Sequence, residues 1–198
     1  MSDIPSPVEK LDNLKSLDKD GDAILSIEDL STHNTIQFLV STKVLSLASP
    51  VFAKMFGPDF EEGHQLRREG LVHVRLGDDD ATAMEIILKA VHYNYTKQLD
   101  AIDAEGLASL AIHCDKYNCR DALYPWISYW FNSFEQRTLS SQDLGFLVLA
   151  AYKFGERKHF ADISTRALRE LPLHFSTTWQ SYEMFNLLPK IVTGVLIK

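Results

Sequence analysis

The stretch that decides the fold runs from Phe38 to Phe56 and reads FLVSTKVLSLASPVFAKMF. At its start, Ile36, Phe38 and Val40 alternate with more exposed positions, and a period of two residues is typical of a strand. After Val40 the apolar residues instead recur at steps of three and four, as on one face of a helix: Val44, Ala48, Val51, Phe52, Met55 and Phe56. The sequence therefore predicts a strand that leads directly into helical structure.

A Ser-Pro pair divides this helical run at Ser49 and Pro50. Serine can cap the helix that follows, and proline at the first helical position loses no N–H that the helix needs. The next glycine and proline, Gly57 and Pro58, stop the second helix. We therefore predict a short helix, a break at Ser49 and a second helix to Phe56.

Two further segments have the pattern of strands. Residues Ala23–Glu28 are apolar and β-permissive, and the polar residues 29–34 separate them from Thr35–Val40. This order predicts a β-hairpin with a long loop. Residues Val72–Leu76 alternate between apolar and polar side chains, which predicts a third strand.

The first residues of the chain, 1–19, are polar and contain two prolines, so we expect a flexible N-terminal segment. The spacing of Leu11, Leu14 and Leu17 allows one or two helical turns there. The polar start lacks the apolar core of a signal peptide.

From Asp78 onward the chain is predicted to be helical. The run Asp78–Asp80 can cap one helix and Asp103 can begin another. Ser140 and Asp143 have the spacing of a capping box at the start of a later helix. Glycine or proline ends each of the last three helical segments, at Gly155, Pro172 and Pro189. The order of elements indicates an α+β domain that is extended by an all-helical C-terminal tail.

Composition limits the classes of function. The chain has 198 residues, 45% of them hydrophobic, and a net charge of −7. Its basic clusters, Arg67–Arg68 and Arg157–His159, are short and flanked by acids, so we expect no nucleic-acid binding. No stretch approaches the ~18 apolar residues of a membrane span. The two cysteines, Cys114 and Cys119, are expected to be reduced thiols in a cytoplasmic or nuclear protein.

An acidic motif resembles the start of a calcium-binding loop. Asp18, Asp20 and Asp22 occupy its first, third and fifth positions. The sixth position, normally glycine, is Ala23, and the twelfth, normally glutamate, is Asp29. The pattern favours an acidic turn that leads into a strand, and calcium binding stays an alternative.

Other candidate chemistry has simpler explanations. His113, Cys114 and Cys119 lack the close pairing of zinc ligands, and Cys114 lies on an apolar helical face. The carboxylates of Asp78–Asp80 are explained by capping and by the helix dipole. The sequence contains no phosphate-binding glycine loop, nucleophile elbow or zinc-protease motif. We therefore expect no enzyme activity, no cofactor and no metal.

Taken together, these elements resemble the signature of the BTB (POZ) domain. The resemblance rests on Phe38–Phe56, on Phe60-Glu61-Glu62 and on Val72–Leu76 followed by a helix that ends near Tyr95. It covers roughly residues 20 to 130. The later stretch Ala111–Cys119, with Pro125, Trp126 and Trp130 after it, is similar to the version common in filamentous fungi.

The resemblance implies a BTB/POZ fold, a helical cluster flanked by a small sheet, over residues 20–120. The segment 1–19 would precede this domain and an all-helical extension, residues 121–198, would follow it. Proteins of this family work as protein–protein interaction adaptors or as homo-oligomerisation scaffolds. Some bind the scaffold cullin-3 and present substrates for ubiquitination.

Members that bind a cullin carry a hydrophobic residue, any residue and then glutamate after the helical pair. By this resemblance the candidate partner contacts are Met55, Phe56, Phe60, Glu62 and Tyr95. An apolar anchor would enter a pocket of the partner, and a nearby carboxylate would fix the register.

One position departs from the family pattern. Many members have histidine and then arginine where this chain has Ser41 and Thr42. Asp22 corresponds to the acidic residue that pairs with that arginine at some family dimer interfaces. The resemblance therefore implies Asp22 as a dimer-interface candidate, with threonine at the partner position.

Overall fold

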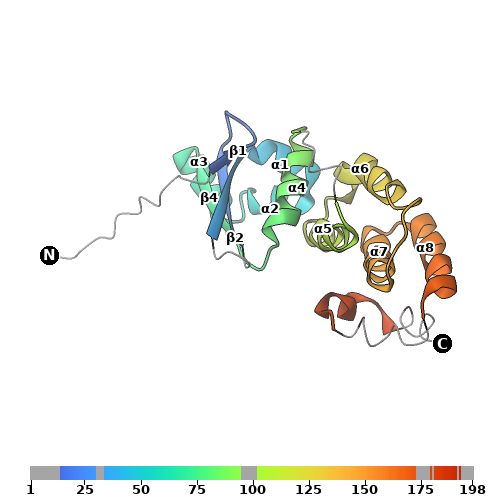
Figure 1. Cartoon of the computed structure of the whole chain (residues 1–198). Helices are drawn as coiled ribbons and strands as arrows, with labels where there is room; N and C mark the ends of the chain where they lie inside the picture. Colours follow the sequence, from blue (N-terminus) through green and yellow to red (C-terminus); the bar gives the residue numbers. More distant parts are fainter. Residues whose placement is uncertain are drawn as a thin grey trace.

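The computed structural model describes residues 14–29, 34–94, 102–172, 179, 181–190 and 192. A four-stranded sheet lies at one end of the molecule, and α5, α7 and α8 lie side by side at increasing distance from it (Figure 1). The order of strands in the sheet is β1-β3-β2-β4. Their bounds are Leu14–Ser16 (β1), Ala23–Asp29 (β2), Asn34–Val40 (β3) and Val72–Leu76 (β4).

The centre of the sheet is the predicted hairpin. β2 and β3 are antiparallel, with Ala23 opposite Val40 and Asp29 opposite Asn34. β4 pairs with the other side of β2 in parallel, starting with Ala23 opposite Val72. The alternation in Val72–Leu76 is reproduced as burial, since its apolar side chains point into the core and His73 and Arg75 point to solvent. The hairpin and the third strand are confirmed.

The helical interpretation of Leu14 and Leu17 is wrong. Residues Leu14–Ser16 form a short strand, parallel to β3, with Leu14 opposite Gln37. Lys15 from this strand places its Nζ 2.6 Å from a carboxylate oxygen of Glu85 in α4. Tertiary pairing therefore overrides the weak helical spacing. Most of the expected flexible segment, residues 1–13, lies outside the described residues.

The helical pair follows the sheet as predicted. Helix α1 spans Thr42–Ala48 and α2 spans Pro50–Met55. The Ser49 hydroxyl accepts the N–H of Phe52 at 3.1 Å and donates to the carbonyl of Tyr117 in α5. Phe52 is buried, and its ring stacks on that of Tyr117 with centroids 4.7 Å apart. The break at Ser49 thus fixes the pair to the core.

One helix, α3, was not predicted from the sequence. Helix α3 spans Glu61–Glu69 and ends at Gly70, whose positive φ of 74° suits glycine. Its sequence, EEGHQLRRE, is strongly polar, and its buried face consists of Gly63 and the partly buried Leu66. So few apolar residues do not form the apolar stripe from which the other helices were predicted.

The later helices match the predicted starts and stops. Asp80, Asp103 and Ser140 cap α4, α5 and α7, and the Ser140–Asp143 capping box is complete. Gly155 ends α7 with a φ of 68°. The bounds are Ala81–Val91 (α4), Ala104–Tyr117 (α5), Arg120–Asn132 (α6), Ser141–Phe154 (α7) and Arg157–Glu170 (α8), and a 3-10 helix, η2, spans Glu183–Leu187.

The predicted fold class is confirmed: a small sheet with helices is followed by a helical C-terminal stretch. One continuous apolar core runs from the sheet through α4 and α5 into α7. Within the parts of the chain that the structure describes, no helix has the length and apolar character needed to cross a membrane.

Candidate functional site

The connection between α2 and α3 presents the predicted anchor. Phe60 stands immediately before α3, in extended backbone conformation, and 48% of its surface is exposed. Its carbonyl accepts the N–H of His64 at 3.1 Å, so the residue belongs to the first turn of α3. Burying an exposed aromatic side chain favours association, which makes Phe60 suitable as an interface anchor.

A close backbone contact fixes the position of Phe60. A Cβ atom at Gly63 would lie 1.8 Å from the carbonyl oxygen of Gly57 and 2.7 Å from that of Phe56. Only glycine lets the start of α3 approach the end of α2 so closely. Sequence analysis missed this residue, because a single glycine in a polar segment gives no signal of contact with a turn six residues earlier.

Two of the predicted neighbours also reach this surface. Glu62 is half-buried in the first turn of α3, and no ion pair or hydrogen bond of its carboxylate is found with the residues the structure describes. Met55, the last residue of α2, is partly buried against the core. The connection and the first turn of α3 thus offer an exposed aromatic ring and a carboxylate two residues apart, and Met55 precedes them at the end of α2.

The other two predicted contacts differ. Phe56 is only 8% exposed, and its ring stacks on Phe52 with centroids 6.0 Å apart. Phe56 therefore belongs to the core and offers little area to a partner. Tyr95 lies outside the described residues.

The dimer-interface candidate, Asp22, is bound within its own chain. One carboxylate oxygen accepts the N–H of Thr42 at 2.7 Å, and the other accepts the Thr42 hydroxyl at 2.8 Å. Thr42 is buried at the start of α1, so this pair joins the sheet to the helical pair. Thr42 stands where the resemblance expects an arginine. It binds both oxygens of the Asp22 carboxylate within the same chain.

The acidic motif at Asp18–Asp22 forms a turn between β1 and β2. A carboxylate oxygen of Asp18 accepts the N–H of Asp20 at 3.0 Å, and Asp22 points to Thr42. Among the residues that the structure describes, no three histidine, cysteine or carboxylate side chains are grouped so that they could hold a metal ion. The turn therefore has the local hydrogen bonds of an Asx turn.

The residues around His113 have structural partners. The N–H of Asp80 donates to Nε2 of His113 at 2.9 Å, and the ring's Nδ1 lies 2.8 Å from the carbonyl of Ser109. Nε2 also lies 3.5 Å from a carboxylate oxygen of Asp79. Cys114 and Cys119 are both buried, and the hydrogen bond to Cys119 together with burial raises the pKa of the Cys114 thiol. A thiol of raised pKa is a poor nucleophile and a poor metal ligand at neutral pH.

The three aspartates before α4 do not act as one cap. Only Asp80 caps the helix, through the N–H of Ala83 at 2.6 Å. Asp79 is buried and binds Lys116 at 2.8 Å and the hydroxyl of Tyr117 at 2.7 Å. Burial and this hydrogen bond raise the pKa of Tyr117. Asp78, with a φ of 58°, turns the chain, so the expectation of a shared capping role is wrong.

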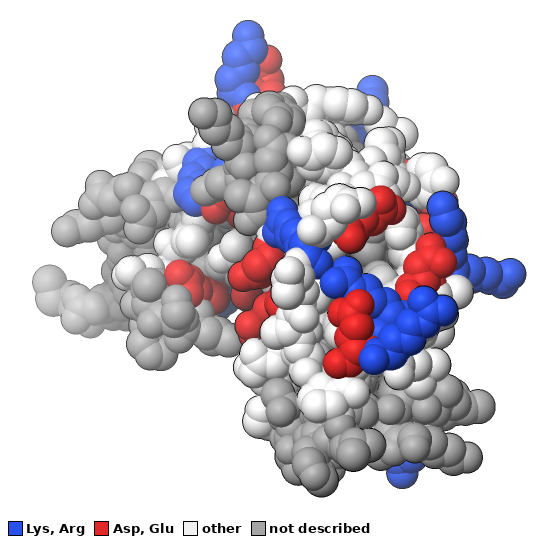
Figure 2. Space-filling view, turned by 45° about the vertical axis from the view of Figure 1, so that its right-hand side comes forward, with Lys and Arg blue, Asp and Glu red and all other residues white. Residues whose placement is uncertain are grey.

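The surface charge is mixed. On the face drawn in Figure 2, Lys and Arg side chains stand beside Asp and Glu side chains and form no single basic patch. Arg166 lies 2.9 Å from Glu170, and Lys153 lies 2.8 Å from Asp115. Paired charges of this kind do not make the electrostatic footprint of a phosphate-binding surface.

Comparison with known proteins gives one assignment. No curated protein matches the chain. The family model of the BTB/POZ domain matches residues 11–123, more than half of the 198 residues. The match includes the whole sheet, the helical pair, α3, α4, α5 and the anchor Phe60. Domains of this family mediate protein–protein interaction and are typically non-catalytic. The chain therefore belongs to the BTB/POZ domain family.

Proposed function

We propose that the chain is an interaction adaptor that binds a cullin-3 type scaffold through the surface formed by Met55, Phe60 and Glu62. The observation that carries the proposal is the exposed ring of Phe60, held in place by the contact between Gly63 and Gly57. A fixed aromatic anchor loses little conformational entropy when it enters a partner's pocket.

Glu62 would supply specificity. Its carboxylate has no bond to replace within the described residues, and it lies two residues from the anchor. A charge beside a buried aromatic contact sets the register of the complex and raises the association rate. The domain, residues 20–120, would carry this surface.

The test is co-elution and calorimetric titration of the full chain with the purified N-terminal domain of cullin-3. The double variant Phe60→Ala/Glu62→Lys should weaken binding by at least about 2 kcal/mol, as loss of a central anchor does. A matched control exists in α8, where Leu168, Arg169 and Glu170 repeat the pattern of hydrophobic residue, any residue and glutamate on an exposed face.

The control variant Leu168→Ala/Glu170→Lys should bind as the unaltered chain does. Equal binding by both double variants, or no binding by the unaltered chain, would refute the cullin contact. The second outcome would leave the chain as an interaction module for another partner.

A second candidate function is a homo-oligomerisation scaffold. Leu47 in α1 is 83% exposed, which is unusual for a leucine on a helix that packs against a core. Self-association through α1 would cover it. Light scattering of the full chain separates a monomer from a dimer, and Leu47→Glu should dissociate a dimer that uses this face.

A further inference from the structure

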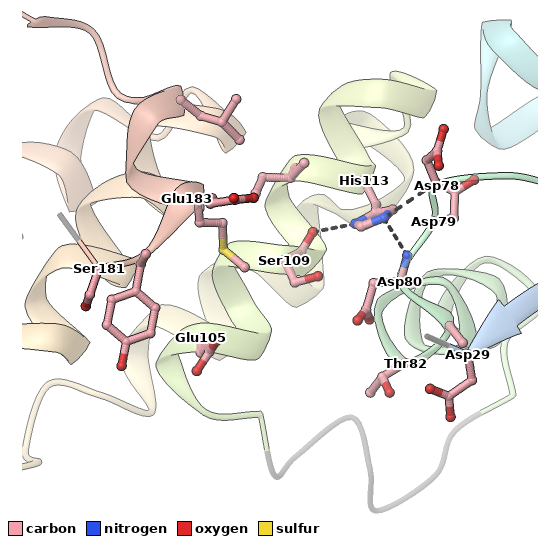
Figure 3. A pocket seen from close by; sticks show the side chains of 15 residues that line it. Asp29, Asp78, Asp79, Asp80, Thr82, Glu105, Ser109, His113, Ser181 and Glu183 are labelled. Carbon is pink, nitrogen blue, oxygen red and sulfur yellow. Dashed lines mark hydrogen bonds and ion pairs between the residues drawn. The ribbon is translucent and has the colours of Figure 1, made fainter. Parts of the chain in front are cut away.

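A cleft of about 830 Å³ lies between the BTB domain and the C-terminal segment, away from the residues assigned to the cullin contact. The turn before α4, with Asp78–Asp80, forms one wall, and α5 contributes Glu105, Ser109 and His113 (Figure 3). Residues Ser181–Leu187, in and before η2, form the facing wall. Its volume is that of a typical ligand pocket.

The facing wall is fixed in place by aromatic packing. Phe185 of η2 packs against Phe146 of α7 with ring centroids 4.8 Å apart, and the indole N–H of Trp179 donates to the carbonyl of Ser141 at 2.9 Å. A Cβ atom at Gly145 of α7 would lie 2.7 Å from the ring of Trp179, so the glycine admits this ring. The cleft is therefore formed before any ligand binds.

The lining of the cleft is acidic and apolar. Its carboxylates are Asp29, Asp78, Asp79, Asp80, Glu105 and Glu183, and neither lysine nor arginine is among the described residues that line it. Asp79 and Asp80 have the partners given above. The carboxylates of Asp78, Glu105 and Glu183 are exposed, and no ion pair or hydrogen bond joins these three carboxylates to the rest of the described chain.

Apolar side chains lie between these charges. Ile112 of α5 and Met184 of η2 are partly buried in the cleft, and Leu187 is 45% exposed at its edge. The carboxylates come from separate walls, and no three of them are grouped to hold a metal ion within the described residues. An extended cation with an aliphatic stem fits such a lining, and arginine and lysine side chains have this form.

We propose that this cleft binds an arginine-containing segment of a protein partner, with guanidinium groups on Asp78, Glu105 and Glu183 and with apolar side chains on Met184 and Leu187. Charge complementarity selects this occupant, because a nucleic acid or an acidic peptide would be repelled by the lining. Arginine also pairs with carboxylates through two parallel hydrogen bonds. The proposal rests on the chain being an interaction module, and it is independent of the partner at Phe60.

The test uses the full chain and a fluorescein-labelled peptide in which arginine and leucine alternate. Fluorescence anisotropy at physiological salt should show saturable binding, and the same peptide with citrulline in place of arginine should bind at least about tenfold more weakly. The triple variant Asp78→Asn/Glu105→Gln/Glu183→Gln should lose about tenfold in affinity for the arginine peptide. Asparagine tolerates the positive φ of position 78, which keeps the turn intact.

The matched control neutralises three exposed carboxylates elsewhere, with Glu69→Gln/Asp121→Asn/Glu135→Gln. Its affinity for the arginine peptide should equal that of the unaltered chain, and Leu187→Ala should weaken binding severalfold. If the triple variant fails to fold by circular dichroism, the double variant Asp78→Asn/Glu183→Gln replaces it. The proposal is overturned if both neutralised variants lose affinity equally, if the citrulline peptide binds as well, or if calcium chloride gives calorimetric heat where the peptide gives none.

Discussion

The surface around Phe60 and the acidic cleft differ in how they are built. The first comes from eight consecutive residues, Met55–Glu62, and offers one exposed aromatic ring with the carboxylate of Glu62 two residues further on. The second draws its lining from β2, from the turn before α4, from α5 and from the segment at η2, which are far apart in sequence. The first presents an exposed side chain, whereas the second is a cleft.

This difference decides what sequence can reveal. A contiguous surface keeps its spacing in the chain, so Phe60-Glu61-Glu62 can be compared with a motif directly. A surface assembled from distant segments has no such spacing, and Glu183 gives no sign in sequence that it lines the same cleft as Glu105. The two surfaces also depend on different stabilising contacts, and these can be broken separately.

The largest effect is expected in the wall of the cleft, at its buried carboxylate. Asp79→Asn removes a buried carboxylate that binds Lys116 and the hydroxyl of Tyr117. The free energy of unfolding should fall by about 2–3 kcal/mol, less than for a fully buried pair because Lys116 reaches solvent. Urea denaturation followed by circular dichroism measures it. The neighbouring change Asp78→Asn, at an exposed position, should stay within about 0.5 kcal/mol.

A result in which both aspartate variants lose equal stability would contradict this division between a supporting and a ligand-facing residue.

The next effect compares one glycine near each surface. Gly63→Ala would place a methyl group against the carbonyl of Gly57 and should lower the free energy of unfolding by about 1–3 kcal/mol. Because the contact positions Phe60, the proposed binding to a cullin-3 type scaffold should weaken as well. Gly77, next to the cleft, has no atom within 4 Å of its Cβ position and no positive φ, so Gly77→Ala should change stability by less than about 0.5 kcal/mol.

The midpoint temperatures of thermal unfolding of the two glycine variants show which of them loses more stability. A loss at Gly77 that equals or exceeds the loss at Gly63 would remove the proposed role of the close contact.

The smallest effect concerns the attachment of α4, which starts at the cleft and ends beside the helical pair. Burial lowers the pKa of His92 below the ordinary value of 6.5, although the hydrogen bond to Leu88 opposes this. The unfolded chain therefore binds the proton first as the pH falls, and stability should decrease once the pH drops below about 6.5. Urea midpoints between about pH 7.5 and 5 test this, with His92→Gln expected to flatten the dependence.

NMR of the histidine rings supplies the direct check. If the His92 ring titrates at or above the value of a free histidine, the assigned cause of the pH dependence is wrong.

Much of the fold could be predicted because its signals are local. Apolar and polar side chains alternate along the strand Val72–Leu76. Ser49 and Ser140 cap helix N-termini with their hydroxyl groups, and Gly155, which has no side chain, ends a helix. β1 and α3 could not be predicted. The first exists through pairing with β3 and the ion pair of Lys15, and the second is a polar helix whose inner contact is made by a glycine.

The candidate sites divide in the same way. Phe60 and Glu62 were predicted from a motif and lie on the surface. Phe56, which is four residues from both Phe52 and Phe60, belongs to the core. Helical spacing does not tell which apolar residue at the end of a helix turns outward. Asp22 directly precedes β2, and its bond to Thr42, which depends on how the sheet meets α1, could not be predicted from the sequence.

Two histidines hold α4 in the same manner. His92 accepts the N–H of Ser41 at 3.1 Å on Nε2, with Nδ1 2.8 Å from the carbonyl of Leu88, and His113 repeats this geometry with the N–H of Asp80 and the carbonyl of Ser109. Ser41 and Asp80 are helix-capping residues, whose amides ordinarily exchange their hydrogen with water quickly. Here an imidazole nitrogen shields each one, so these two amides should exchange as slowly as those inside the helices. The rate of deuterium uptake at each of these two amides then reports whether the Nε2 atom of the neighbouring histidine still accepts its hydrogen bond.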